Sequence, residues 1–434
     1  MRFLRSSLVT DAQALEALAP AWTDLLARSD ANELMLTPDW LLPWWSTFGK
    51  LDKRQLHVVV FYDDDQLVGL APFLKRRHWH RPGLPFLRLE PLGSGERPME
   101  AICSDYLNII AERGKEAEVA HQFAEMLAKG RLGNWDELLL PMMDGSSIMP
   151  ELLAQACRQQ GLSATCTTTS IAPYIPLPST WEEYLRSLDK KKRYSLLRTQ
   201  RDFDEWAKGE AKVVQVQTKK DLEEGRRILH SLHHERWEDG GEKGVFRAPR
   251  FLIFHKAVQE SFLPKGQLHL SWLCVRGTPI AALYCFQWNR KIYFYQCGRK
   301  TELPKQVRPG TILLAYAIRS AIERGMREFD FLAGAAFYKS QLTWASRPIV
   351  QLRVARPGGK EQLRRWFEWG VESTRPLRAR LRSLRNSKRS SPHPPTSPST
   401  TAPLEQENAS IGASSQRIGI TIAPSRESSA TILD

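Results

Sequence analysis

The stretch that decides the fold of this chain runs from Lys291 to Thr343 and reads KIYFYQCGRKTELPKQVRPGTILLAYAIRSAIERGMREFDFLAGAAFYKSQLT. It begins as a strand pattern, passes through a basic loop to Pro309-Gly310 and continues as one long helical pattern. A second short strand is expected at 329–332, and the polar residues 338–340 follow it. This order of elements is able to hold a phosphorylated cofactor.

The junction at 308–311, Arg-Pro-Gly-Thr, gives the physical reason. Proline fixes the backbone for a helix start, and glycine lets the chain approach a ligand closely. Free N–H groups and the positive dipole end of a helix attract phosphate. Lys300, Lys305 and Arg308 lie in the same loop. The alternative is a plain helix start with solvated cations, and the loop alone does not decide between the two.

Length and composition limit the class of protein. A chain of 434 residues exceeds the usual size of one domain, so two folded units are expected. No apolar run approaches the length of a membrane-spanning helix, and residues 1–11 make a poor signal peptide. The six cysteines form no C-x-x-C pair. This usage predicts reduced thiols and a cytoplasmic protein without disulfides.

The positive charge is concentrated near the C-terminus. Residues 356–389 hold eleven Lys/Arg against three Glu, out of a net charge of +14. This distribution argues against a DNA-binding body. Residues 357–385 read as a basic amphipathic segment that contacts an anionic membrane surface, peripherally at the inner membrane face, or as a solvated helix that packs on the core. Residues 386–434 contain no aromatic residue and are expected to be a disordered tail.

The N-terminal part alternates helices and strands. A stripe of Trp40, Leu41, Trp44 and Trp45 follows a helix start at Thr37 and is typical of a buried core. Asp105 and Tyr106 are expected at the head of an apolar strand. Helices are predicted at 11–27, from 37, 115–128 and 150–160, and strands at 56–62, 67–74, 86–89, 104–110, 137–140 and 164–169.

The second part begins with an extended, Pro-rich connector at 171–178 and a helix that opens at Ser179-Thr180. The basic run 190–193 is either a solvated face or a guide for an anionic substrate. A helix at 222–237 carries His233 as a cleft-lining candidate, and its histidines lack the spacing of a metal site. Strands are predicted at 213–217, 268–275, 280–288 and 292–297.

The two parts share a layout, because each has a hairpin followed by helix, strand, helix and strand. A mixed α/β protein built from two copies of one unit is therefore expected.

Several segments resemble one family when they are taken in order along the chain. They are 37–45, 104–106, 174–178, 181–185, 309–330 and 338–339. Together they resemble the bacterial CelD/BcsL-type acetyltransferases of the GNAT superfamily over residues 1–356. That family is similar in turn to the Fem peptidoglycan aminoacyltransferases. The resemblance implies tandem GNAT-like domains, with boundaries at 1–170, a connector and basic helix at 171–210, and the acyl-CoA site in 211–356.

The resemblance also implies residue roles. Asp330 would position or deprotonate an ammonium group, Tyr338 would protonate the departing sulfur, and Lys339 would hold phosphate or an anionic acceptor. Donor contacts are implied for Tyr295, Cys297, Arg308, Gly310 and Thr311, and acceptor contacts for Asp105, Tyr106 and His233. The chain departs from the family at 333–339, where Ala-Gly-Ala-Ala-Phe-Tyr-Lys replaces the common Arg-Gly-Asp-Glu-Pro-Tyr-Lys.

The implied function is N-acyl transfer without a metal. Acetyl-CoA or another acyl-CoA would be the donor, and an amine of a sugar, glycolipid or polysaccharide precursor the acceptor, in cellulose or exopolysaccharide production. One alternative uses aminoacyl-tRNA as donor, as the similarity to Fem proteins allows. Another is a non-catalytic accessory protein that keeps the fold, which the missing charges at 333–336 favour.

Overall fold

The computed structural model describes residues 4–81, 83–239, 244–334, 336–368 and 421–422. The chain divides into two compact units, Met1–Pro357 with Ile420–Asp434, and Gly358–Gly419. In the second unit, residues 359–368 are helical. The rest of the expected basic segment 357–385, and the expected tail 386–434 apart from 421–422, lie outside the described residues.

The N-terminal half of the large unit contains helices and two hairpins. Its elements are β1 (Arg5–Val9), α1 (Ala12–Ala17), α2 (Ala19–Ala27), α3 (Pro38–Phe48), β2 (Gln55–Leu56), β3 (Val58–Asp63), β4 (Gln66–Ala71), β5 (Phe73–Arg81), β6 (Leu84–Pro91), β7 (Ile110–Ala111), α4 (Glu116–Ala128), β8 (Glu137–Asp144), α5 (Met149–Gln159) and β9 (Ser163–Pro176).

The C-terminal half follows directly. Its elements are α6 (Trp181–Ser187), α7 (Lys190–Ala207), β10 (Ala211–Gln215), α8 (Lys219–Asp239), α9 (Pro249–Phe262), β11 (Leu268–Val275), β12 (Thr278–Trp288), β13 (Lys291–Arg299), α10 (Pro309–Glu323), β14 (Glu328–Asp330), α11 (Phe337–Leu342), β15 (Ala345–Ala355) and β16 (Thr421–Ile422).

Two sheets organise the large unit. The smaller has the order β1-β3-β4-β7, and the larger the order β16-β10-β11-β12-β13-β14-β9-β15-β8-β6-β5-β2. Strand β9 pairs with β15 from Ser163 to Tyr174 and with β14 from Tyr174 to Pro176. The segment expected as a connector at 171–178 is thus mostly part of a strand that joins strands of both halves.

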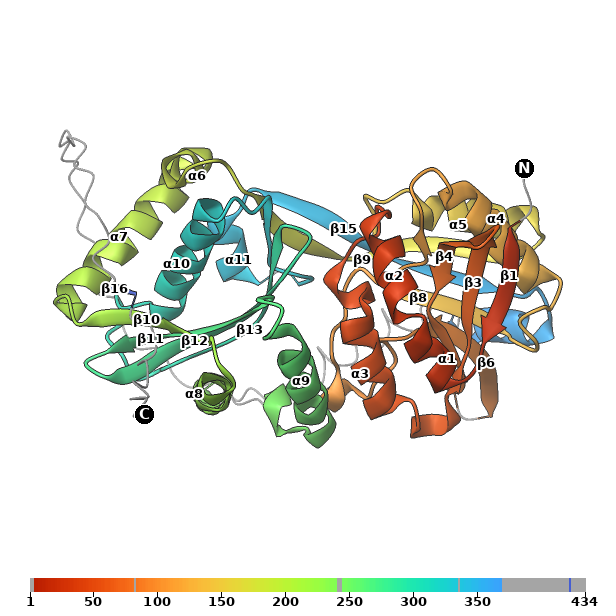
Figure 1. Cartoon of the computed structure of the whole chain (residues 1–434), viewed down its shortest axis with the longest axis horizontal. Helices are drawn as coiled ribbons and strands as arrows, with labels where there is room; N and C mark the ends of the chain where they lie inside the picture. The colour runs from red at the N-terminus through yellow and green to blue at the C-terminus, as the bar shows by residue number, and fades with distance from the viewer. Residues whose placement is uncertain (1–3, 82, 240–243, 335, 369–420, 423–434) are drawn as a thin grey trace, which may run out of the picture. The chain divides into compact units, whose positions relative to one another are not determined.

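Alternation of side chains places apolar residues on both faces of these sheets. On β12, Tyr284 and Phe286 belong to the core that includes α8 and α9, whereas Leu283 and Cys285 belong to the core that includes α7 and α10. Figure 1 shows α6, α7 and α10 on one side of strands β10–β13 and α8 and α9 on the other. Strands β11 and β12 are therefore covered on both faces and read as apolar runs.

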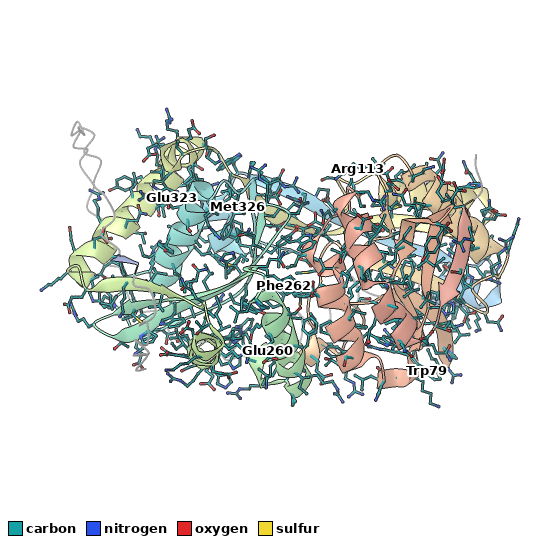
Figure 2. The ribbon with its side chains drawn as sticks, in the orientation of Figure 1. Trp79, Arg113, Glu260, Phe262, Glu323 and Met326 are labelled. Carbon is teal, nitrogen blue, oxygen red and sulfur yellow. The ribbon has the colours of Figure 1, made fainter. Side chains whose placement is uncertain are left out.

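The predicted aromatic core is confirmed. Trp40 and Trp44 are fully buried. The Trp40 ring packs edge-to-face on Phe254 and Phe286, with ring centroids 5.1 Å and 5.6 Å apart. On α9, Phe262 is buried, while the exposed Glu260 lies 3.3 Å from the buried Arg226 of α8 (Figure 2). The core thus runs from α3 of the first half into α9 and β12 of the second.

One predicted helix is broken in the structure, and one predicted strand is largely absent. The helix expected at 11–27 is broken at Leu18 into α1 and α2, because Pro20 lacks an N–H and its ring opposes a continuous helix. The strand expected at 104–110 is wrong except at its end, because Cys103 and Tyr106 adopt φ of 53° and 61°. Asp105 and Tyr106 lie instead in a loop.

Two further expectations concern covalent and membrane features. All six cysteines are free thiols. Among the described residues, no helix has the length and apolar character needed to cross a membrane.

Candidate functional site

A pocket of about 540 Å³ lies between the C-terminal end of β13 and the start of α10. It includes four of the five residues expected at a donor, namely Cys297, Arg308, Gly310 and Thr311, together with Tyr338. The remaining lining residues are Arg236, Asp239, Gly298, Arg299, Lys300, Thr301, Leu303, Pro304, Lys305, Val307, Pro309 and Leu314. We call this cavity the α10 pocket.

The α10 pocket is strongly cationic. Five of its lining residues are Lys or Arg and one, Asp239, is acidic. Helix α10 begins at Pro309 without a side-chain cap. Pro309 has no N–H, and the Thr311 N–H donates to the carbonyl oxygen of Arg308 at 3.0 Å, so the Gly310 N–H and the positive dipole end remain for a ligand. A phosphate-bearing ligand fits this combination of charge and helix start.

The strands beside the pocket diverge. β13 and β14 run parallel and pair only from Lys291 to Tyr293, after which β13 continues to Arg299 while β14 ends at Asp330. A β-bulge lies where they separate, because Tyr284 is opposite Gln296 while Cys285 is opposite Phe294. Tyr295 is thus the extra residue, which bends the strand and interrupts its ladder toward β12.

At the pocket wall, Arg236 Nη1 donates to Cys297 Sγ at 2.8 Å. The ring of Tyr338 meets that of Phe294 edge-to-face at 6.3 Å. Burial raises the pKa of Tyr338 and, against the charge of Arg236, that of Cys297. Both groups therefore carry their protons at neutral pH, and Tyr338 is able to donate one.

Tyr295 and His233 lie outside the lining of the α10 pocket. The Tyr295 hydroxyl donates to the carbonyl oxygen of Ile102 at 2.5 Å. His233 is buried beneath Gly298, where an added Cβ would come within 2.4 Å of the His233 backbone nitrogen. Burial lowers the pKa of His233 to about 4, so its ring is neutral. His233 thus packs on β13 from α8, whereas Tyr295, which belongs to β13, packs against the core that includes α9.

A second cluster joins the two halves. The Tyr106 hydroxyl donates to Asp330 Oδ2 at 2.8 Å, and the Leu332 N–H donates to Asp330 Oδ1 at 2.7 Å. Burial raises the pKa of Asp330 to about 7, while the charge of Arg347 opposes this shift. Asp330 is therefore divided between its acid and carboxylate forms near neutrality.

Asp105 and Lys339 complete this cluster, because both bind the backbone of the loop that follows β14. The Ala333 N–H donates to Asp105 Oδ2 at 2.6 Å, and Lys339 Nζ donates to the carbonyl oxygens of Leu332 and Ala333 at 3.2 Å and 3.1 Å. Burial raises the pKa of Asp105 to about 6, against the Ala333 N–H and the Lys339 charge. Burial lowers the pKa of Lys339. Lys339 thus binds this loop and is absent from the lining of the α10 pocket.

The backbone at this cluster is strained on both sides. Tyr106 and Leu332 have φ of 61° and 58°, a region that residues with a Cβ seldom adopt. The hydrogen bond from Tyr106 to Asp330 joins two segments that are 224 positions apart in the sequence, and each segment contains one residue in this unfavourable conformation. Strain of this kind concentrates at functional sites.

A polar pocket of about 370 Å³ lies at the beginning of β13 and β14. Lys291 Nζ lies 2.6 Å from Glu33 Oε1, and Arg347 Nη2 lies 2.5 Å from Glu328 Oε1. Further lining carboxylates come from Asp30, Glu116 and Asp144. The acidic side chains outnumber the basic ones, which favours a cationic ligand.

The sequence did not single out several of these residues. Arg236 lies three positions after His233 on α8, so helical spacing placed it on a similar face. Arg299 adjoins the basic loop that was singled out. Arg347 and Glu33 carried no local signal, because they reach the cluster only through the pairing of distant strands.

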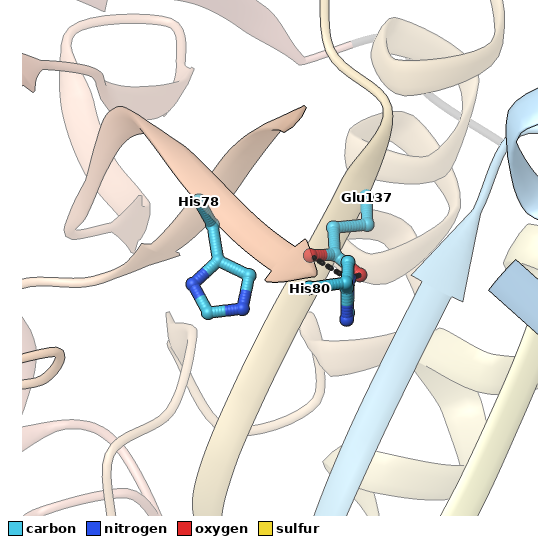
Figure 3. Close-up of side chains that lie close together, drawn as sticks. All are labelled: His78, His80 and Glu137. Carbon is cyan, nitrogen blue, oxygen red and sulfur yellow. Dashed lines mark hydrogen bonds and ion pairs between the residues drawn. The ribbon is translucent and has the colours of Figure 1, made fainter. Parts of the chain in front are cut away.

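His78, His80 and Glu137 place potential ligand atoms within 4.8 Å of one another (Figure 3). However, Glu137 accepts hydrogen bonds from His80 Nε2 at 2.9 Å and from Arg88 Nε at 2.8 Å, and Arg353 Nε donates to it at 2.9 Å. Burial would raise the pKa of Glu137, but these partners hold it at about 2. Two guanidinium groups already neutralise the carboxylate and oppose a bound cation, so the cluster reads as an ion network.

Comparisons with known proteins agree with this geometry. Residues 190–340 match the family described as acetyltransferase (GNAT) domain. No curated protein matches the sequence. The crystal structure of FemX is 8% identical, with a TM-score of 0.55 over 84% of this chain and 100% of that chain. A conserved protein of unknown function from Bacteroides thetaiotaomicron VPI-5482 is 12% identical, with a TM-score of 0.51 over 81% and 100%.

A tandem GNAT protein from the clavulanic acid biosynthesis pathway is 11% identical, with a TM-score of 0.40 over 82% of this chain and 100% of that chain. The predicted mixed α/β fold of GNAT type is confirmed. The matched segment 190–340 contains the α10 pocket and Asp330, Tyr338 and Lys339. Residues 190–340 of this chain are therefore similar to an acetyltransferase domain of the GNAT type.

Proposed function

We propose that the protein is an acyl-CoA-dependent N-acyltransferase, with acetyl-CoA or another acyl-CoA as donor. The observation that carries the proposal is the α10 pocket, which combines five cations and the start of α10 with the half-buried side chain of Tyr338. The cations, the Gly310 N–H and the positive dipole end of α10 would hold the phosphates of the donor. Its acyl end would lie toward Tyr338, where β13 and β14 diverge.

N-acyl transfer needs an uncharged amine, a stabilised oxyanion and a proton for the leaving thiolate. In the proposed reaction the amine nitrogen bonds to the thioester carbon, and the carbon–sulfur bond breaks. Asp330 or Asp105 takes the proton that the amine loses, because each has a pKa near neutrality. Tyr338 gives its proton to the departing sulfur and recovers one from solvent.

The acceptor class is proposed from charge. The polar pocket at Glu33 and Glu328 is rich in carboxylates, and an amine acceptor arrives as a cation. The resemblance to CelD/BcsL-type acetyltransferases supports an amine on a sugar, glycolipid or polysaccharide precursor. On this proposal residues 1–170 and 211–356 are the two GNAT-like domains, and 171–210 is the connector with its basic helix.

Two alternatives have specific support. The likeness in fold to FemX and the basic run 190–193 favour an aminoacyl-tRNA donor. Alanine at 333, 335 and 336, where the resemblance leads one to expect charge, favours a non-catalytic accessory protein. The proposed cellular place is the cytoplasm, peripherally at the inner face of the membrane.

Thermal unfolding with added ligand tests the donor proposal. A ligand that binds only the native state raises stability by RT ln(1 + [L]/Kd), or about 2.7 kcal/mol at a hundredfold excess over Kd. We expect acetyl-CoA, longer acyl-CoAs or free CoA to raise Tm. The double variant Lys305→Gln with Arg308→Gln should weaken the shift, whereas Lys219→Gln with Lys220→Gln, exposed at the start of α8, should leave it unchanged. The absence of any shift at millimolar ligand would refute a CoA site.

A further inference from the structure

The outward face of α7 has an unusual composition. The helix buries Leu196, Thr199, Phe203 and Ala207 against the core. The opposite side presents Lys190, Lys191, Tyr194, Leu197, Arg198 and Arg201, all of them exposed. We call these six residues the α7 face. Figure 1 shows α7 on the side of the sheet that α6 and α10 also cover.

Helix stability does not account for the cations of α7. Residues 190–201 contain six Lys/Arg and no Asp or Glu, and the first turn holds no acidic residue. Cations at a helix N-terminus face the positive end of the dipole, and like charges one turn apart repel each other. Arg198 has its ion-pair partner, Asp202, 3.6 Å away and past this stretch. The N-cap Asp189 accepts from the Lys192 N–H and lies 3.4 Å from Lys192 Nζ, so it offsets part of this charge. Among the described residues, Lys190, Lys191 and Arg201 have no ion-pair partner, so helix stability does not account for these three cations.

Two apolar side chains of the α7 face are exposed. Tyr194 is 54% exposed and Leu197 39% exposed. They are three positions apart, so they are neighbours on the helix surface. The exposed cations of the α7 face lie on the same side of the helix.

We propose that the α7 face docks on an anionic phospholipid surface. Lys and Arg on this helix face attract the lipid phosphates, while Tyr194 and Leu197 between them enter the interfacial layer. An RNA partner would use the same cations, but it offers no apolar layer for Leu197. The inference goes beyond the proposed function, because lipid binding needs no donor in the α10 pocket.

Co-sedimentation of the full chain with vesicles tests this interaction, using phosphatidylcholine vesicles with and without phosphatidylglycerol. We expect binding only to the anionic vesicles, and less of it at high salt. Lys190→Gln with Lys191→Gln should lower the partition coefficient roughly 30-fold, at about fivefold for each cation removed. Tyr194→Ser with Leu197→Ser should also weaken binding, because it removes the apolar contacts.

Matched controls lie elsewhere on the surface. Lys219→Gln with Lys220→Gln removes the same charge from exposed positions on α8, and Ile253→Ser removes an exposed apolar side chain from α9. Both should bind vesicles like the natural chain, and all variants should keep its Tm and its shift with acetyl-CoA. A variant that loses vesicle binding but keeps the Tm shift with acetyl-CoA separates this inference from the donor proposal.

Three results would overturn the proposal. One is that the natural chain does not bind anionic vesicles. Another is that both α7-face variants bind them as tightly as the controls do, since the basic segment after residue 356 would then account for the binding. The third is that the variants lose retention of transfer RNA at moderate salt while vesicle binding is unchanged, which would assign the face to nucleic acid.

Discussion

At the scale of single residues, burial raises the pKa of three acidic groups of the site. Tyr338 stays protonated at neutral pH, as tyrosines ordinarily do, whereas the pKa of Asp105 and of Asp330 rises to about 6 and about 7. The sequence indicated all three as candidate site residues. It did not predict that Tyr106 would meet Asp330, because φ > 0 at a tyrosine has no local sequence signal.

Removal of the Tyr338 hydroxyl tests its proposed role as proton donor. In Tyr338→Phe the ring contact with Phe294 is kept, so the Tm shift with acetyl-CoA should stay close to that of the natural chain. Release of the CoA thiol in the presence of an amine acceptor should fall about a hundredfold or more, as is usual for loss of a general acid. Unchanged turnover would show that solvent protonates the leaving group.

The pH dependence of stability tests the burial of Asp330. Its pKa is about 7 in the folded chain, above the usual 3.8. A carboxyl whose folded pKa is raised contributes stability that is complete at low pH and is lost as pH rises through the folded value. Asp330→Asn removes this titration. The natural chain should therefore lose a few kcal/mol relative to the variant between pH 4 and pH 7, as measured by denaturant unfolding at each pH.

At the scale of elements, local pattern and long-range pairing contribute differently. Helix α10 begins at the predicted Pro309, and α6 is capped by Thr180 as predicted, because both signals lie within a few residues. By contrast, β9 extends to Pro176, beyond the predicted 164–169, because it pairs with β15 and β14. Both partners lie far along the chain, so the local pattern did not show where the strand ends. The donor side of the site was predictable because the start of α10 is a local signal. Arg347 on β15 was missed because it reaches the site through the pairing of distant strands.

Two glycines beside the α10 pocket should respond differently to a methyl group. In Gly298→Ala the new Cβ would lie 2.4 Å from the backbone of α8, so β13 or α8 must move. A loss of about 1–3 kcal/mol in unfolding free energy is expected. In Gly310→Ala the nearest atom, on Arg299, is 3.9 Å away, so stability should be kept. Chemical denaturation measures both, and equal stabilities would contradict the close packing of β13 on α8.

At the scale of the whole molecule, the large unit is held together across the expected domain boundary. The core around Trp40 continues into α9, and β9 pairs with β14, β15 and no other described strand. The sequence predicted two similar halves, but it gave no measure of how firmly they are joined, since contacts between positions hundreds of residues apart leave no periodicity.

Cooperative unfolding follows from these shared contacts. We expect residues 4–357 to unfold in one transition, because loss of either half exposes the core around Trp40 and separates β9 from its partners. Tryptophan fluorescence and far-UV circular dichroism of the full chain should then give the same midpoint in denaturant. Two resolved transitions would show that the halves are independently stable.

The continuity of β9 also affects where the protein tolerates insertions and deletions. A one-residue deletion within a paired strand turns every following side chain to the opposite face. Within β9, such a deletion would disturb the pairing with β15. It would also disturb the pairing with β14, where Tyr174 of β9 lies opposite Asp330. Loops such as the turn at Gly277 leave room for insertions, so changes of length should accumulate there, whereas β9 should keep the same number of residues.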